Sequence, residues 1–115
     1  MNNKYYQSLQ TIKTCINNIE NFIGSPKSFE QYDGNLLLQA AVERNLEIIG
    51  EAIKRLLDIN PVIVISNTRS IINTRNKISH GYDEIENTQI WGIIINHLPV
   101  LKIEIENLLN QGINE

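Results

Sequence analysis

The sequence predicts an all-α protein, folded as an antiparallel, up-down bundle of four helices. Apolar residues recur at three- and four-residue spacing through most of the chain, which places them on one face of each helix. Short connections containing Gly, Pro or Asn separate these segments, and short connections favour antiparallel neighbours. With 115 residues, the chain is expected to form a single domain over residues 1–115 with one modest core.

The first helix is expected from about Asn3 to Ile23. Gly24 is placed to cap its C-terminus, and Pro26 lies just beyond. Residues 28–34 follow as a connection with room for a short helical turn. The apolar residues of the helix fall on one face, and they are Tyr6, Leu9, Ile12, Ile16, Ile19 and Ile23.

The second helix is expected from about Asn35 to Leu57, a segment rich in Leu, Ala, Glu and Arg, which are all good helix formers. Asn60-Pro61 ends it. Residues 62–65 are all β-branched. A run this short, with no partner strand, favours a linker packed on the core or a helical turn over a strand.

The third helix is expected to begin near Ser66 or Asn67, either of which can cap it, and to end at Gly81. The fourth is expected from about Asn87 to Leu109. Pro99 lies inside it and predicts a kink, because its ring removes a backbone donor and clashes with the preceding turn. The apolar set of this helix is Ile90, Trp91, Ile94, Leu98, Leu101, Ile105 and Leu108.

Composition and charge exclude several classes of protein. No apolar run approaches the roughly 20 residues that span a bilayer, and no signal peptide is expected. The single cysteine, Cys15, excludes an internal disulfide, argues against a cysteine-based metal site and fits the reducing cytoplasm. A net charge of −3 argues against general attraction to nucleic acid. Residues 59–82 nevertheless contain no acid, and Arg69 and Lys77 in that stretch are candidate RNA-binding residues.

The segment from Arg75 to Tyr82 carries an arginine, a histidine five residues later, a glycine and a tyrosine. An arginine presents a planar fork of donors to phosphate oxygens, and a histidine exchanges a proton near neutral pH. Such residues suit cleavage of RNA, which carries its own nucleophile, the 2′-hydroxyl. They equally suit a solvated pair at a helix end. On an unbroken helix Arg75 and His80 would lie about 140° apart, so a common cleft requires the helix to end near Gly81.

The pattern Arg-x4-His-x-Tyr resembles the signature of HEPN-domain ribonuclease toxins of the HepT type. Residues 41–52 resemble the second helix of that family, and Trp91 early in the fourth helix fits it as well. The resemblance implies a HEPN-type bundle that forms a homodimer with the motif at the subunit interface. It further implies a metal-independent endoribonuclease without a cofactor, in which Arg75 and His80 are catalytic and Asn76 supports them.

The resemblance also implies a regulatory partner. A HepT-type protein is the toxin of a type VII-like toxin–antitoxin pair, and its antitoxin is a minimal nucleotidyltransferase that attaches AMP to the tyrosine of the motif, here Tyr82. Tyr82 could instead simply pack its ring at a helix end. The alternative for the whole protein is a non-catalytic helical module that binds a nucleotide or docks a nucleotidyltransferase, in which the motif only grips phosphate.

Glu43, Glu47 and Glu51 form a stripe at four-residue spacing. Like charges at this spacing repel, so cations are expected nearby, and Arg55 is one expected partner of Glu51. No metal site is expected, since bundle sites usually add a histidine three residues on. The stripe is therefore a solvated or ion-paired face, or one of its glutamates orients Arg75. The other histidine, His97, is expected to be structural.

Overall fold

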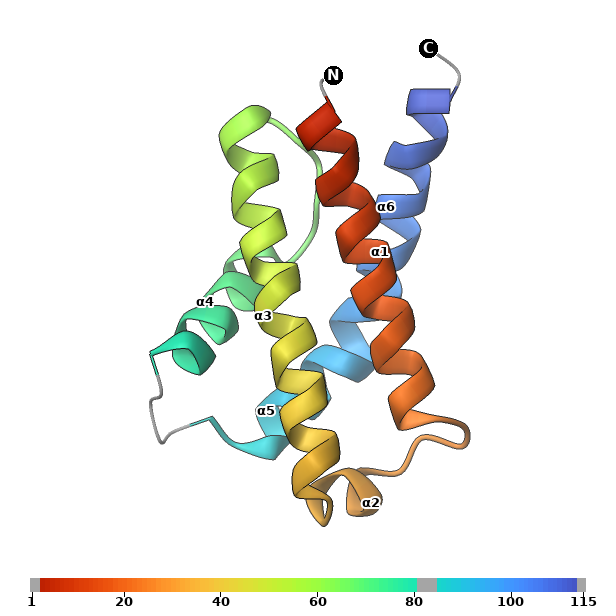
Figure 1. The fold of residues 1–115 in the computed structure, drawn as a ribbon, viewed down its shortest axis with the longest axis vertical. Coiled ribbons are helices and arrows are strands. Elements are labelled where there is room, and N and C mark those ends of the chain that lie inside the picture. Colours follow the sequence, from red (N-terminus) through yellow and green to blue (C-terminus); the bar gives the residue numbers. More distant parts are fainter. Residues whose placement is uncertain (1–2, 81–84, 114–115) are drawn as a thin grey trace.

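The computed structural model describes residues 3–80 and 85–113, and its regular elements are helices (Figure 1). The predicted all-α, up-down bundle is confirmed. The α1, α3 and α4 helices and the continuous α5–η1–α6 segment form it, with α2 as a short addition. The bounds are α1 Asn3–Ile23, α2 Phe29–Asp33, α3 Leu36–Ile59, α4 Thr68–Ser79, α5 Asn87–Gly92, the π-helical η1 Ile93–His97 and α6 Leu98–Ile113.

The core lies where α1 packs between α3 and α6, as Figure 1 shows. The middle of the apolar stripe predicted for α1 is buried, while its two ends, Tyr6 and Ile23, are only partly buried. Tyr5, which was not predicted to belong to the stripe, is buried. Each of the three helices presents one such stripe to the others. The fully buried side chains include Leu9, Ile12, Ile16 and Ile19 of α1, Leu46, Ile49, Ile53 and Leu56 of α3, and Leu101 of α6.

Local capping fixes the ends of the first helices largely as predicted. Gly24 adopts the left-handed conformation, with φ 73°, and its N–H donates to the carbonyl of Glu20 at 2.9 Å. The Ser28 hydroxyl caps α2, which is the short turn expected within residues 28–34. Asn35 caps α3 by accepting from the N–H of Leu38 at 3.0 Å. The α3 helix then continues to Ile59, past the predicted end at Leu57.

The start of α4 differs from the prediction. Asn67 is the residue before the helix, but its φ is 62° and its side chain makes no capping hydrogen bond. Ser66 does not cap the helix either, because its N–H and its hydroxyl both donate to the carboxylate of Glu104 in α6, the hydroxyl at 2.8 Å. A contact between distant segments therefore replaces the predicted local cap.

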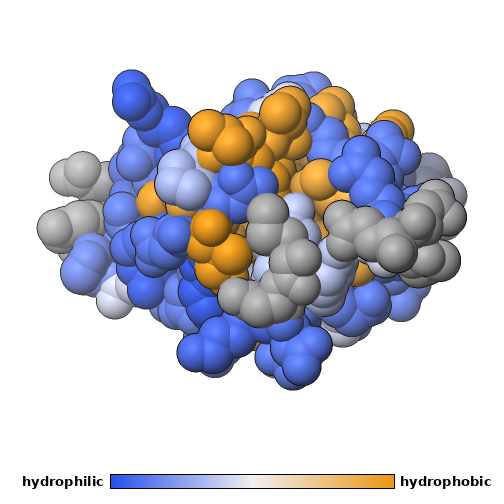
Figure 2. Space-filling view, turned by 90° about the horizontal axis from the view of Figure 1, so that it is seen from above, coloured by the Kyte–Doolittle hydropathy of each residue, from blue (hydrophilic) through white to orange (hydrophobic). Residues whose placement is uncertain are grey.

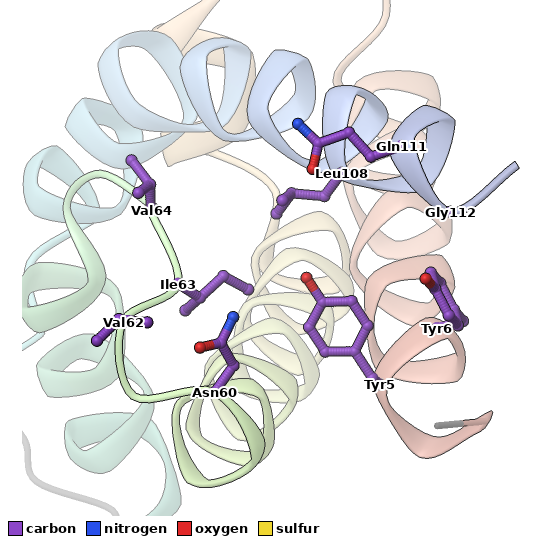
Figure 3. Close-up of a pocket in the computed structure, with 9 residues that line it drawn as sticks. All are labelled: Tyr5, Tyr6, Asn60, Val62, Ile63, Val64, Leu108, Gln111 and Gly112. Carbon is purple, nitrogen blue, oxygen red and sulfur yellow. The ribbon is translucent and has the colours of Figure 1, made fainter. Parts of the chain in front are cut away.

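The linker before α4 packs on the core, as predicted. Ile63 and Ile65 contact the core, while Val62 and Val64 are exposed. The linker also walls a hollow of about 320 Å³ between α1 and the last turns of α6 (Figure 3). Figure 2, which views this end of the bundle, shows apolar residues gathered within a mainly hydrophilic surface.

Pro99 shapes the last helix through a π turn. The helix is continuous from Asn87 to Ile113, longer than predicted, but it widens over η1 just before Pro99. The N–H of Leu98 donates to the carbonyl of Ile93, five residues back. A wider turn makes room for the proline ring, which would clash with the carbonyl four residues before it in a regular α-helix. The predicted irregularity thus takes the form of one wide turn. No helix of the described residues is long and apolar enough to cross a membrane.

Because the two positions differ in burial, alanine substitutions at a buried and at an exposed position of α3 should change stability by clearly different amounts. Ile49→Ala should lower the free energy of unfolding by about 2–5 kcal/mol, since it leaves a cavity at a fully buried site. Leu37→Ala, at a side chain that is 82% exposed, should change it by less than about 0.5 kcal/mol. Urea unfolding followed by circular dichroism measures both, and equal losses would contradict the assigned core.

Candidate active site

The α4 helix packs closely against α3 at Arg75. A Cβ atom built on Gly50 of α3 would lie 2.4 Å from Cβ and 2.7 Å from Cγ of Arg75. Any side chain at position 50 would therefore displace the aliphatic stem of Arg75. A glycine inside a helix of strong helix formers is the sequence signal for such an approach, but Gly50 was not among the predicted site residues.

The guanidinium of Arg75 is held from two sides. Its Nη2 lies 3.3 Å from Oε1 of Glu51 in α3, and its Nη1 donates to Oδ1 of Asn76 at 3.0 Å. The side chain is 22% exposed. A glutamate of the predicted stripe thus contacts Arg75. The predicted pairing of Arg55 with Glu51 is wrong, because Arg55 points to α1, where its Nε donates to the hydroxyl of Ser8.

A second polar contact joins the two helices one turn away. The hydroxyl of Ser79 donates to Glu47, which also accepts from Nη1 of Arg44 at 2.9 Å. The hydrogen bond from Ser79, followed by that from Arg44, holds the pKa of Glu47 below its usual range. Burial instead raises the pKa of Glu43. The stripe is therefore neither uniform nor simply solvated: Glu51 and Glu47 bind α4, and Glu43 does not share their environment.

His80 lies at the exposed C-terminal end of α4. The helix ends at Ser79, and the N–H of His80 donates to the carbonyl of Asn76 at 3.0 Å. Because this hydrogen bond spans four residues as in a regular α-helix, the backbone of His80 still follows the helical repeat, which places its side chain about 140° around the helix from that of Arg75. Gly81, the predicted end of the helix, and Tyr82, the predicted modification site, lie outside the described residues.

The structure separates the predicted RNA-binding residues from Arg75. Arg69 is exposed near the start of α4. Lys77 is two residues from Arg75, about 200° around the helix, and lines a groove between α4 and the α5–η1 segment. Arg75, Asn76 and Glu51 are thus brought together, His80 is placed at the end of the same helix, and Lys77 faces another side.

The described residues also include no group of three or more His, Cys, Asp or Glu side chains placed to hold a metal ion. Cys15 is buried in α1, and burial raises the pKa of its thiol. Trp91 packs against Phe29 and Tyr32 of α2, with ring centroids 5.8 and 5.6 Å away. These aromatic rings attach the short helix to α5.

Comparison with known proteins gives a consistent family. The model of the family described as "Ribonuclease HepT-like" matches residues 12–108. "Putative RNase MJ0127" of Methanocaldococcus jannaschii is 31% identical over 106 residues, which cover 90% of this chain and 83% of that protein. "Putative RNase TTE0752" of Caldanaerobacter subterraneus subsp. tengcongensis is 31% identical over 85 residues, covering 73% and 76%. No solved structure matches the chain significantly.

The contact between Ser79 and Glu47 should make stability depend on pH. Ser79→Ala should lower the free energy of unfolding at neutral pH by about 1 kcal/mol, because Glu47 loses a donor. The folded pKa of Glu47 is lowered, so its stabilising effect is present above the unfolded pKa and is lost as pH falls through the folded value. The difference between the two proteins should therefore shrink below about pH 4.

Urea unfolding of both proteins at neutral and acidic pH measures this effect. Ser70→Ala, at an exposed hydroxyl of the same helix, controls for the substitution itself. A difference that stays unchanged in acid would show that the hydroxyl acts through something other than the Glu47 carboxylate.

Proposed function

Because the family model covers most of its length, this chain belongs to the HepT-like ribonuclease family, and we propose that it is a metal-independent endoribonuclease. It acts in the cytoplasm as the toxin of a type VII-like toxin–antitoxin pair. The observation that carries this proposal is the arginine of the motif, held in place by Glu51 and Asn76 at the end of the helix that leads into His80.

Arg75 stabilises the charge that develops on the phosphoryl oxygens. An arginine has five N–H donors, and Glu51 and Asn76 engage only one terminal nitrogen each. The remaining donors of those nitrogens can bind phosphate in the fork geometry that suits it. Because Glu51 and the packed stem already fix the side chain, less freedom is lost when substrate binds. Glu51 is in this sense a positioning residue, and Asn76 shares that role.

His80 moves the proton. The 2′-oxygen of the ribose forms a bond to phosphorus, the bond from phosphorus to the 5′-oxygen breaks, and the products carry a 2′,3′-cyclic phosphate and a 5′-hydroxyl. One histidine accepts the 2′-hydroxyl proton, and a second donor protonates the leaving oxygen. A single His80 cannot do both at once. A homodimer with the motif at its interface supplies two Arg75/His80 pairs to one cleft, and His80 is exposed at the C-terminal end of α4, where a partner could reach it.

The catalytic residues are tested by replacement. His80→Ala and Arg75→Ala should each lower kcat at least about 100-fold, since each removes a group used in the transition state. Cleavage by the wild type should persist in a metal chelator and leave cyclic phosphate ends. Purified protein incubated with RNA, followed by end-group analysis, measures all of these.

The control is Arg55→Ala, which removes an exposed arginine that contacts α1 rather than α4 and should retain activity. Glu51→Gln keeps the shape of the positioning contact without its charge and should lower kcat less than Arg75→Ala does. Loss of cleavage in chelator would sink the metal-free mechanism. RNA that binds but is never cleaved would favour the non-catalytic, phosphate-gripping module instead.

We further propose that Tyr82 is the control point. It follows His80 by two residues in the sequence, and a phenol can accept a nucleotidyl group. In this step the phenolic oxygen bonds to the α-phosphorus of ATP, the bond to the β-phosphate breaks, and pyrophosphate leaves while the phenol loses its proton. The cognate minimal nucleotidyltransferase binds the ATP and catalyses the transfer. The added phosphate charge beside the motif opposes the approach of an RNA backbone.

Co-expression with the partner nucleotidyltransferase should add one or more AMP masses to the chain, and peptide mapping should place them on Tyr82. Tyr82→Phe should keep ribonuclease activity but escape silencing, because it lacks the accepting oxygen. Tyr6→Phe, at a tyrosine on α1, should still be silenced. A silenced Tyr82→Phe without any adduct would mean that the antitoxin acts by covering the cleft.

A further inference from the structure

A polar groove of about 370 Å³ lies between α4 and the α5–η1 segment. Among the residues that the structure describes, its lining includes no Asp or Glu. Asn73 and Lys77 of α4 form one wall, Gln89 of α5 and Asn96 and His97 of η1 form the other, and Gly92 lies between them. The groove is on the side of α4 away from the Arg75–Glu51 contact, so the site described above does not include it.

Three amide side chains converge on this groove. Asn73, Gln89 and Asn96 are exposed, and within residues 3–80 and 85–113 their side chains make no hydrogen bond. An amide offers both a donor and an acceptor, the combination that pairs with the edges of an unstacked nucleic-acid base. The groove therefore suits a planar polar group better than an apolar one.

Lys77 supplies a positive charge at the groove. It is partly buried at the edge of the groove and forms no ion pair within the described part of the chain. Since no carboxylate of the described residues neutralises Lys77, none of them reduces its attraction for a phosphate. The combination of one cation with three amides matches a unit that carries both a phosphate and a base.

The η1 wall carries a buried polar atom that lacks a partner. Nδ1 of His97 is inaccessible to solvent and has no hydrogen-bond partner among the described residues. Buried polar atoms are normally paired, so the described residues leave a hydrogen-bonding site of this wall unsatisfied. The π turn places Asn96 and His97 in this wall, and such turns often occur at functional sites.

Gly92 keeps the floor of the groove open. A Cβ atom built there would meet nothing within 4 Å in the described structure, so protein packing does not demand a glycine at this position. Glycine is a poorer helix former than alanine, and the helix would gain from a side chain here. The glycine leaves an open backbone surface against which a flat ring can pack.

We propose that this groove is the subsite for one nucleotide of the RNA, with Lys77 on its phosphate and the three amides on its base above Gly92. The proposal rests on the proposed ribonuclease function and adds where the strand lies. Lys77 and His80 are three residues apart, which places them on neighbouring positions along α4. A nucleotide held by Lys77 thus belongs to the strand that passes His80.

Binding of a short single-stranded RNA of mixed sequence tests the proposal, measured by fluorescence anisotropy on the full chain carrying His80→Ala to prevent cleavage. Gly92→Leu should fill the groove without displacing described protein atoms and weaken binding about tenfold or more. Lys77→Ala should weaken it about tenfold and reduce the salt dependence by about 0.7 in the log–log slope.

Each variant has a matched control. Ala40→Leu adds the same side chain to an exposed position of α3, and Lys27→Ala removes the same charge from the exposed connection before α2. Both controls should bind RNA like the parent. Circular dichroism of all four confirms that the helices are retained.

A second experiment measures the binding of free AMP and free UMP, because a mononucleotide offers the same phosphate and base as a unit of RNA. The proposal expects both to bind more weakly than the RNA and to compete with it. If either binds through Lys77 while the RNA neither binds nor competes, the groove serves a free nucleotide, and the RNA subsite is overturned.

The nucleotide subsite and the ribonuclease activity can be disproved independently of each other. If the wild type cleaves RNA but Gly92→Leu and Lys77→Ala bind it as the controls do, the subsite is overturned and the ribonuclease stands. If the wild type cleaves no RNA but RNA binding still depends on Gly92 and Lys77, the ribonuclease fails and the nucleotide subsite is supported.

Discussion

The approach of α4 to α3 at Gly50 and Arg75 is the contact on which the rest of the site depends. Without a side chain at position 50, the stem of Arg75 packs directly against the α3 backbone. That approach leaves the side chain of Arg75 only 22% exposed, and a partly buried charge is less costly when it is paired. Glu51, the next residue of α3, provides that charge. Close packing and charge pairing therefore require each other at this point.

The same contact orients the whole of α4. Glu51 meets Arg75, and Glu47, one turn earlier in α3, meets Ser79, one turn later in α4. The two contacts run in opposite order along the two helices, as antiparallel packing requires. They leave the last residue, His80, beyond the helix and exposed. The 12 residues of α4 thus carry a face fixed to α3, an end that projects, and a second polar face toward α5 and η1.

Pro99 shapes the wall that η1 contributes to the groove between α4 and the α5–η1 segment. A proline inside a helix forces the preceding turn to widen or bend, and here the turn widens over Ile93–His97. Ile93 and Ile94 of that turn stay in the core, while Asn96 and His97 line the groove facing α4. A backbone irregularity in one helix thereby shapes a surface that it shares with another.

The sequence by itself determined the helices, because spacing within a helix is a local property. The stripe of α1, the left-handed Gly24, the Asn35 cap and the irregularity before Pro99 all follow from residues within a turn or two of one another. The motif could also be recognised, since Arg75 and His80 lie on one continuous segment. The role of Gly50 had a signal too, as a glycine among strong helix formers.

Only the tertiary structure decided which charged and polar groups meet across helices. Arg55 follows Glu51 by four residues, yet Ser8 of another helix takes its guanidinium and Arg75 takes the carboxylate. Ser66 could cap α4, yet Glu104 from α6 binds it instead. Lys77 and Arg75, two residues apart, face different sides. In each case the partner depends on the register in which two helices pack, and that register is set by the fit of whole faces rather than by local spacing.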